Sequence, residues 1–395
     1  MLDRRGFLVS IAAAAAAYPL RTASAAGAPP VVFGLDAEFG HVTSTSAPAI
    51  RQGMLVAMHE INAAGGVLGG RPLSLVERDN RSVPARGIAN VRELAAIPDL
   101  VGVFCGKFSP VVIETIPVAH ERELILCDPW AAADEIVDNG RKPNYVFRLS
   151  LRDSWAIPTI IDYAKRRGFT RLGALLPNTA WGRGNQVAIE SHARANPWLG
   201  VVGTGWYNWG DASLAQKYLD LTRAGAQAIL LVANETEASI LVKEMAAMPA
   251  ADRVPLLSHW GMSGGDFLAM CGDALKSVDM AVVQTVTLAG RSDPRLLGVM
   301  RSARDALGIR AASEIKSQVG FAHAYDLTHI LARAVDKAGT THRPTVRDAM
   351  EALGPFDGLV MSYAEPFTAT RHEALRPDLL FMGRFGVDGI TPVAD

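Results

Sequence analysis

Short apolar stretches alternate with longer amphipathic segments from Val31 onward, and this alternation predicts β-strands and α-helices in turn. Four stretches in the first part of the chain have the composition of buried strands: Val31–Gly34, Pro72–Asp79, Leu100–Cys105 and Leu124–Cys127. Three segments between them carry apolar residues at helical spacing: Ala47–Ala63, Pro84–Ile97 and Pro110–Arg122. Strands that alternate with helices predict a parallel sheet with crossover helices.

The same pattern starts again after Tyr145–Leu149. A second series of strands is predicted at Arg171–Leu176, Val201–Trp206, Ala228–Val232 and Pro255–Ser258. Helices are predicted between them at about Trp155–Arg167, Asn185–Ala195, Ser213–Ala224 and Thr236–Met248. A strand at Ala281–Val286, helices at Arg295–Leu307, Ile315–Ala338 and Thr345–Leu353, and a turn-rich tail complete the chain. The sequence therefore predicts an α/β protein with two doubly wound parallel sheets.

The stretch Gln52–Asn80 is the most informative segment of the chain. Its first part has helical spacing, Gly65-Gly66 ends that helix where positive φ angles are needed, and an extended segment follows Pro72. The sequence motif EINAAGG followed by GR-x-L resembles the second-helix box of leucine/isoleucine/valine-type periplasmic solute-binding proteins, which serve ABC importers. The resemblance implies a type I periplasmic binding protein fold, with a first lobe of residues 31–149 plus 285–356 and a second of residues 150–284 plus 357–395. A three-segment hinge is expected to join the lobes, with crossings near Leu149–Leu151, Val283–Thr285 and Phe356–Gly358.

The amino terminus looks like an export signal. Residues Asp3–Leu8 resemble a twin-arginine signal, an apolar run follows at Val9–Tyr18, and Ala23-Ser24-Ala25 supplies small residues for cleavage. A membrane-anchoring helix is the alternative, but the run is too short and too rich in alanine for a stable span, which needs about 20 strongly apolar residues. We therefore expect a signal peptide at residues 1–26 and a periplasmic protein exported by the twin-arginine route.

Composition narrows the classes of partner. The formal net charge is -1 and 20% of the residues are charged, so the chain lacks the basic footprint of a nucleic-acid-binding protein. The three cysteines show no spacing typical of a zinc site, and no metal or other cofactor is expected. A disulfide between Cys105 and Cys127, which end consecutive predicted strands, is conceivable but not favoured. The expected partners are a small-molecule ligand and a membrane permease, with the protein itself a monomer.

Ligands of open α/β sheets bind beyond the carboxyl ends of the strands, often at helix amino termini. The loop Gly106-Lys107-Phe108-Ser109 follows such a strand, and Ser109-Pro110 is typical of a helix start. A ligand carboxylate could bind the Ser109 hydroxyl and the amides after it, and the resemblance implies that Ser109 matches the family's ligand-binding serine. The alternative is that Ser109 only caps its helix. Lys107 is either a cation for that carboxylate or a solvated side chain.

The next strand leads into Asp128-Pro129-Trp130-Ala131-Ala132, which the resemblance aligns with the family's P-A-A-T ligand loop. Trp130 replaces a small residue there, and Ala132 stands where the family has threonine. In the second lobe, Trp181 precedes a glycine as the family's ligand-covering aromatic residue does. Trp260 falls where the family commonly has a glutamate for the α-ammonium, and Asn234 is a further polar candidate at a strand end.

Three tryptophans, at positions 130, 181 and 260, thus follow predicted strands, and we expect at least two of them to line one cleft. Such walls suit an aromatic or otherwise flat, apolar ligand. With Glu38 or Asp128 nearby they could instead form a cage for a quaternary ammonium. Trp198, Trp206 and Trp209 are interpreted as packing residues.

Two other motifs point to different classes of protein. Gly102-x3-Gly106-Lys107 is one residue too short for a phosphate-binding loop and lacks the Ser or Thr after the lysine. The sequence from Gly261 to Gly265 fits the G-x-S-x-G elbow of a serine esterase, with Ser263 as nucleophile. However, Asp326 and His329 lie three apart on one predicted helix, which argues against a triad. The expected function is therefore a non-enzymatic substrate-binding component of an ABC importer; a ligand-sensing receptor of the same fold is the alternative.

Overall fold

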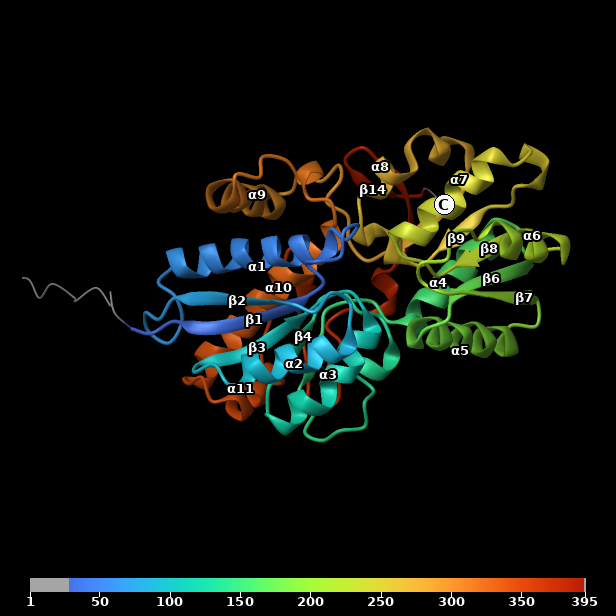
Figure 1. Cartoon of the computed structure of the whole chain (residues 1–395). Helices are drawn as coiled ribbons and strands as arrows, with labels where there is room; N and C mark the ends of the chain where they lie inside the picture. Colours follow the sequence, from blue (N-terminus) through green and yellow to red (C-terminus); the bar gives the residue numbers. More distant parts are fainter. Residues whose placement is uncertain (1–27, 394–395) are drawn as a thin grey trace, which may run out of the picture.

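Two β-sheets form the centres of two lobes, seen at left and right in Figure 1. The computed structural model describes residues 28–393. The first lobe has a five-stranded sheet with the order β2-β1-β3-β4-β5, and all its strands are parallel. These strands are β1 Val31–Ala37, β2 Leu73–Asp79, β3 Leu100–Cys105, β4 Ile125–Asp128 and β5 Val146–Arg148. The predicted signal at residues 1–26 lies outside the described residues.

Helices cover both faces of the first sheet because its strands are apolar on both faces. Phe33 and Leu35 of β1 pack into one cluster, and Val32 packs into another on the opposite face, as the period of two in a strand requires. The first cluster includes α1 (Ser46–Ala63) and α10 (Gln318–Ala338), and the second includes α2 (Pro84–Ala95) and α3 (Ser109–Glu121). Helices α9 (Pro294–Leu307) and α11 (Arg343–Met350) complete this lobe.

Glycines in the first helical unit serve close packing and a reversal of the chain. A Cβ on Gly53 of α1 would lie 2.2 Å from the Phe321 carbonyl oxygen, so glycine lets α1 and α10 approach closely. Gly65 and Gly66 have φ angles of +111° and +75°, which confirms that the helix ends in conformations that favour glycine. The box that resembles periplasmic binding proteins is therefore scaffold of the first lobe.

The second lobe has a seven-stranded sheet with the order β14-β13-β10-β9-β8-β6-β7, in which β13 pairs antiparallel with β10 and β14 pairs antiparallel with β13. Its strands are β6 Arg171–Pro177, β7 Gly200–Tyr207, β8 Ala228–Leu231, β9 Leu256–Ser258, β10 Met280–Gln284, β13 Phe381–Gly386 and β14 Gly389–Pro392. Its helices are α4 Asp153–Arg166, α5 Ala180–Ala195, α6 Ala215–Arg223, α7 Glu235–Ala247 and α8 Phe267–Cys271. The predicted fold class, two wound parallel-sheet lobes, is confirmed.

The carboxyl-terminal tail departs from the predicted division. The hairpin of β11 (Phe356–Asp357) and β12 (Ser362–Tyr363) is followed by residues that pack on β5. The Phe367 ring lies 5.0 Å from that of Phe147, and His372 Nδ1 lies 2.7 Å from the Val146 carbonyl oxygen. Residues 367–373 therefore pack on the first lobe, although the sequence analysis assigned them to the second. Strands β13 and β14 do join the second sheet.

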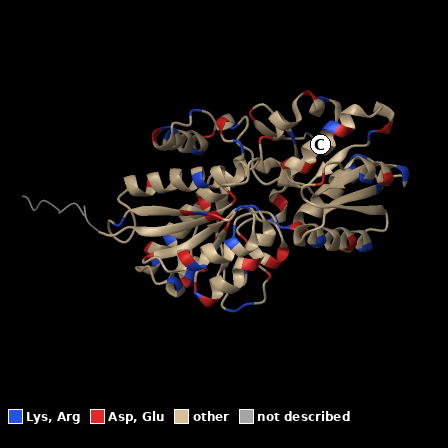
Figure 2. Ribbon diagram, in the orientation of Figure 1, with Lys and Arg blue, Asp and Glu red and all other residues tan. Residues whose placement is uncertain are grey.

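Charge is spread over the molecule rather than gathered by sign. Lys and Arg positions are interspersed with Asp and Glu positions along the ribbons of both lobes (Figure 2). Within residues 28–393, no helix has the length and apolar character needed to cross a bilayer. The same part of the chain holds no group of three His, Cys, Asp or Glu side chains placed to bind a metal ion. Cys105, Cys127 and Cys271 are buried free thiols, and burial raises the pKa of each.

Candidate functional site

A small cavity lies between the lobes, beyond the carboxyl ends of both sheets. We call it the interlobe cleft. The first lobe contributes the β3–α3 loop and the residues after β4, and the second contributes the residues after β6, β7, β8 and β9. Its lining residues are Lys107, Phe108, Ser109, Pro110, Trp130, Ala132, Trp181, Trp209, Asn234, Trp260 and Gly261. Most of the residues singled out in the sequence thus meet around one cavity.

Tryptophans from the two lobes face each other in this cleft. The Trp130 and Trp260 ring centroids are 5.5 Å apart with a tilt of 40°, and both side chains are buried. The Trp181 Nε1–H donates to Asp153 Oδ1 at 3.1 Å, which fixes the indole while its ring lines the cleft. Behind Trp130, α10 has a glycine, Gly320, and a Cβ there would lie 2.7 Å from the indole. The cleft therefore has large, fixed aromatic walls.

Trp209 was interpreted as a packing residue, but it lines the cleft as well. It follows β7, and its ring meets Phe108 edge-on at 5.2 Å. Its buried Nε1–H has no hydrogen-bond partner among the described residues. The rule of strand ends that selected the other tryptophans applies equally to Trp209. The packing interpretation also fails for Trp206, which is 38% exposed on the edge strand β7.

Ser109 lines the cleft but does not cap its helix. It is the first residue of α3, its Oγ accepts the Ala133 N–H at 3.3 Å, and Phe108 occupies the N-cap position. The backbone N–H groups that were expected to bind a carboxylate either donate to other protein atoms or are absent. Pro110 has no N–H, and the N–H groups of residues 111 and 112 donate to the Phe108 carbonyl oxygen. The Ser109 hydroxyl itself is therefore the polar group that this helix start presents to a ligand.

Lys107 is neither solvated nor a free cation. Its Nζ lies 2.7 Å from Glu235 Oε2 on α7 of the opposite lobe, and the two side chains are 1% and 0% exposed. Thr43 Oγ1 donates to the other oxygen of Glu235 at 2.8 Å. Close by, the Thr45 N–H donates to the Gly264 carbonyl oxygen at 2.7 Å. We call these contacts of Thr43, Thr45 and Lys107 with Glu235 and Gly264 the interlobe latch.

Neither acid proposed for an ammonium cage faces the tryptophans. Glu38 accepts hydrogen bonds from Ser44 Oγ at 3.0 Å and from the Lys107 N–H at 3.3 Å, and it borders a separate cavity beneath α3. Asp128 Oδ1 accepts the N–H groups of Trp130 and Ala131, at 3.0 and 2.7 Å. Burial raises the pKa of Asp128 to about 7. Both carboxyl groups therefore hold loops in place. Neither is available as the acidic group of a quaternary ammonium cage.

Arg148, which the sequence analysis missed, supports the loop that carries Trp130. Its guanidinium donates to the carbonyl oxygens of Ala131 and Ala133, at 3.3 and 2.7 Å, and pairs with both oxygens of Glu373, at 2.5 and 2.9 Å. Ala131, a predicted ligand contact, is thus turned toward Arg148 and does not line the cleft. An arginine inside an apolar strand could have indicated this role from the sequence, because a buried charge needs a buried partner.

His323 connects the hinge with the same loop and gives a testable pH dependence. Its Nε2 lies 2.9 Å from Thr285 Oγ1 and its Nδ1 lies 2.9 Å from the Pro129 carbonyl oxygen. Burial lowers its pKa from 6.5 to about 4. As the pH falls from 6.5 to 4, the unfolded chain therefore takes up this proton before the folded one, and stability is lost, by at most about 3 kcal/mol.

We expect urea unfolding to show this loss as a difference between the wild type and the variant His323→Gln. Between pH 7 and pH 4.5 the wild type should lose more stability than the variant. Asp128 and Asp326, whose pKa values burial raises to about 7 and about 6, act in the opposite direction but are common to both proteins. Parallel pH profiles for the two proteins would exclude this role of His323.

The Ser263 hydroxyl is bonded within its own turn. Ser263 Oγ donates to the Trp260 carbonyl oxygen at 2.6 Å. His329 Nε2 lies 3.1 Å from Glu60, and Asp326 accepts hydrogen bonds from the backbone of Leu359 and from Tyr363. The three residues of the proposed esterase triad therefore have separate partners, and the esterase alternative has no structural support.

Comparisons with known proteins agree with this architecture. A family model described as periplasmic binding protein matches residues 35–383. The leucine-, isoleucine-, valine-, threonine- and alanine-binding protein of Pseudomonas aeruginosa is 23% identical over 305 residues, which is 76% of this chain and 77% of that protein.

Solved structures show the same fold at low identity. A type 1 periplasmic binding protein from Bordetella pertussis has a TM-score of 0.82 at 18% identity, and the match covers 92% of this chain and 100% of that one. A branched-chain amino acid substrate-binding protein from Streptococcus pneumoniae, in complex with isoleucine, has a TM-score of 0.76 at 17% identity, with 91% and 97% covered. A solute-binding protein from R. palustris in complex with 4-hydroxybenzoate has a TM-score of 0.76 at 14% identity, with 92% and 95% covered. The match of the family model over most of the sequence shows that this chain belongs to the periplasmic binding protein family.

Proposed function

We propose that the protein is the substrate-capturing component of an ABC importer and binds a small, flat, mostly apolar molecule in the interlobe cleft. Four tryptophans and Phe108 around a single interlobe cavity are the observation that carries this proposal. Aromatic faces stack well on flat apolar rings. The related solute-binding protein from R. palustris, which was solved with 4-hydroxybenzoate, supports this class of ligand.

The charges around the cleft argue against a free α-amino acid. A zwitterion needs one partner for its carboxylate and another for its ammonium group. The Lys107 and Glu235 side chains are paired with each other, and Glu235 does not line the cavity. Ser109, Asn234 and the Trp209 Nε1–H, which is unpartnered among the described residues, remain to bind one polar substituent. We therefore favour an aromatic compound with one polar or carboxylate group over leucine or isoleucine.

Ligand capture follows from rotation of the two lobes about their connections. The open form admits the ligand, and closure brings Trp130 and Trp260 into contact beside it and forms the interlobe latch. The membrane permease then recognises the closed form, and the protein acts as a periplasmic monomer without a catalytic step. The proposal that the protein is exported by the twin-arginine route rests on the signal-like sequence of residues 1–26.

A receptor that reports to a regulatory partner is the alternative function. Genes for two permeases and two ATPases beside the gene for this protein would exclude that alternative.

Thermal-shift measurements with benzoate, 4-hydroxybenzoate, leucine, isoleucine and glycine betaine test the ligand class. We expect the two aromatic acids to raise the melting temperature, because a ligand at 100 times its Kd stabilises the folded state by about 2.7 kcal/mol. Trp181→Ala should weaken their binding about 10-fold or more, whereas Trp181→Phe should keep most of it. Stabilisation by leucine and isoleucine, with none by the aromatic acids, would contradict the proposed ligand class.

A further inference from the structure

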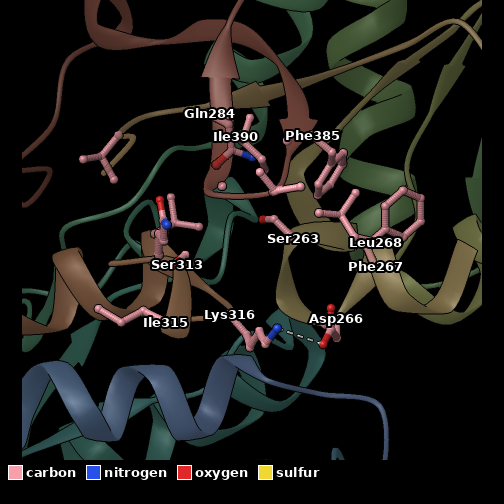
Figure 3. Close-up of a pocket in the computed structure, with 17 residues that line it drawn as sticks. Ser263, Asp266, Phe267, Leu268, Gln284, Ser313, Ile315, Lys316, Phe385 and Ile390 are labelled. Atoms are coloured by element: carbon pink, nitrogen blue, oxygen red, sulfur yellow. Dashed lines mark ion pairs between the residues drawn. The ribbon is translucent and has the colours of Figure 1, made fainter. Parts of the chain in front are cut away.

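A second cavity, which is partly open to solvent, lies beside the β13–β14 turn (Figure 3). We call it the hairpin cavity. Its walls are residues 263–268, the end of β10 at 284–286, residues 313–319, and the turn at 385–390. Residues 313–319 lead into α10, which packs in the first lobe, residues 284–286 leave the second sheet at the end of β10, and the other two segments belong to the second lobe. The hairpin cavity therefore contacts both lobes but is separate from the interlobe cleft.

The wall of the hairpin cavity combines an apolar side with several polar groups, and its rim is electrically balanced. The Phe267 and Phe385 rings lie 4.8 Å apart and form one side with Leu268, as Figure 3 shows. At the rim, Lys316 Nζ lies 3.2 Å from Asp266 Oδ2, so each charge neutralises the other. A molecule that fits this cavity accordingly has an apolar part for the aromatic side and carries no net charge.

One polar group in the wall has no partner. Gln284 is 2% exposed, and its buried Nε2 has no hydrogen-bond partner among the described residues. Gln318 in the same wall is satisfied, because its Nε2 donates to the Ala312 and Asp388 carbonyl oxygens and its Oε1 accepts the Leu288 N–H. A buried donor without an acceptor is unfavourable, so a ligand oxygen placed there gains a hydrogen bond that the protein itself does not make.

We propose that the hairpin cavity is a second ligand site, which binds a neutral molecule with an apolar chain and a carbonyl oxygen that accepts a hydrogen bond from Gln284 Nε2. Occupancy of this site also favours closure of the lobes. The Ser317 Oγ–H donates to the Ser263 carbonyl oxygen at 3.0 Å, and the next residue, Gly264, accepts the Thr45 N–H in the interlobe latch. A ligand that holds residues 313–319 against residues 263–268 thus supports the same contacts.

Binding of 2-heptanone, compared with 2-methyl-1-heptene, tests the proposal, because the second compound replaces C=O with C=CH₂. The wild type should bind the ketone saturably and about 10-fold more tightly than the alkene. Gln284→Met should remove this preference, and Leu268→Trp, which fills the cavity, should remove binding of both compounds. Trp181→Ala, in the interlobe cleft, should leave ketone binding unchanged. An equal affinity of the wild type for the two compounds, or ketone binding that survives Leu268→Trp, would overturn the proposal.

Two further measurements keep the test independent of any single variant. In protein labelled with ¹⁵N-glutamine, the ketone should move the side-chain NH₂ signal of Gln284 and the alkene should not. In the absence of added compound, Gln284→Met should keep or raise the melting temperature, whereas Gln318→Met should lower it because it leaves three backbone groups without their partner. A fall in melting temperature for Gln284→Met equal to that for Gln318→Met would show that the Gln284 amide is already satisfied and would contradict the site.

Discussion

Replacing Glu235 with alanine is expected to open the two lobes. The change leaves the buried Lys107 ammonium without its carboxylate, and breaking a buried pair in this way costs about 3–5 kcal/mol. Because the two residues belong to different lobes, rotation about the hinge exposes Lys107 to water without unfolding either lobe. The equilibrium should therefore shift toward the open form, and ligand affinity should fall about 100-fold or more because closure becomes less favourable.

Small-angle scattering measures this opening as an increase in the radius of gyration. Glu237→Gln is the matched control. Glu237 lies in the same turn of α7 and is buried, but it accepts the Gly210 N–H within its own lobe, so this variant should scatter like the wild type. The double variant Lys107→Met with Glu235→Leu replaces the pair with apolar groups and should largely restore closure. Unchanged scattering and ligand affinity in Glu235→Ala would show that the latch does not hold the lobes.

Glu373→Ala should destabilise the fold itself. Arg148, which is fully buried, then loses both carboxylate contacts, and the expected cost is again about 3–5 kcal/mol. Here both partners lie in the first lobe, so hinge rotation gives Arg148 no access to water, and the cost should appear in the free energy of unfolding. The loop that carries Trp130 depends on Arg148, so ligand affinity should fall as well.

Urea unfolding of the wild type and the variant checks this expectation. Glu365→Ala provides the control, because Glu365 is an exposed residue of the same tail, and its removal should change stability by less than about 0.5 kcal/mol. The double variant Arg148→Met with Glu373→Met removes the charge together with its partner and should be more stable than Glu373→Ala. If Glu373→Ala unfolds at the same urea concentration as Glu365→Ala, the Arg148–Glu373 pair contributes little to the fold.

Local sequence patterns were enough to predict both lobes, because alternating strands and helices leave a regular periodicity. They failed where glycine or distant contacts decide the structure. Helix α5 begins at Ala180 rather than at Asn185, since Thr179 accepts the Gly182 N–H and caps a turn that contains two poor helix formers, Gly182 and Gly184. The tail has no periodicity that would assign it to a lobe; its place depends on Arg148 and Glu373, which are 225 residues apart.

The positions of the site residues, like the fold, could be predicted only in part from the sequence. The rule of strand ends selected Ser109, Trp130, Trp181 and Trp260, which line one cleft, because the carboxyl ends of parallel strands meet at one edge. The rule says where a side chain begins, but it does not identify its partner. Lys107 therefore looked like a cation for a ligand, while its actual partner, Glu235, lies 128 residues further along the chain.

The three buried free thiols bear on the order of folding and export. The periplasm oxidises thiols, and three cysteines in an unfolded chain can form three different bridges, none of which the folded protein contains. Under the proposed twin-arginine route, the chain folds in the reducing cytoplasm and reaches the periplasm with each sulfur already enclosed. Burial of Cys105, Cys127 and Cys271 would then replace the protection that a native disulfide gives to other exported proteins.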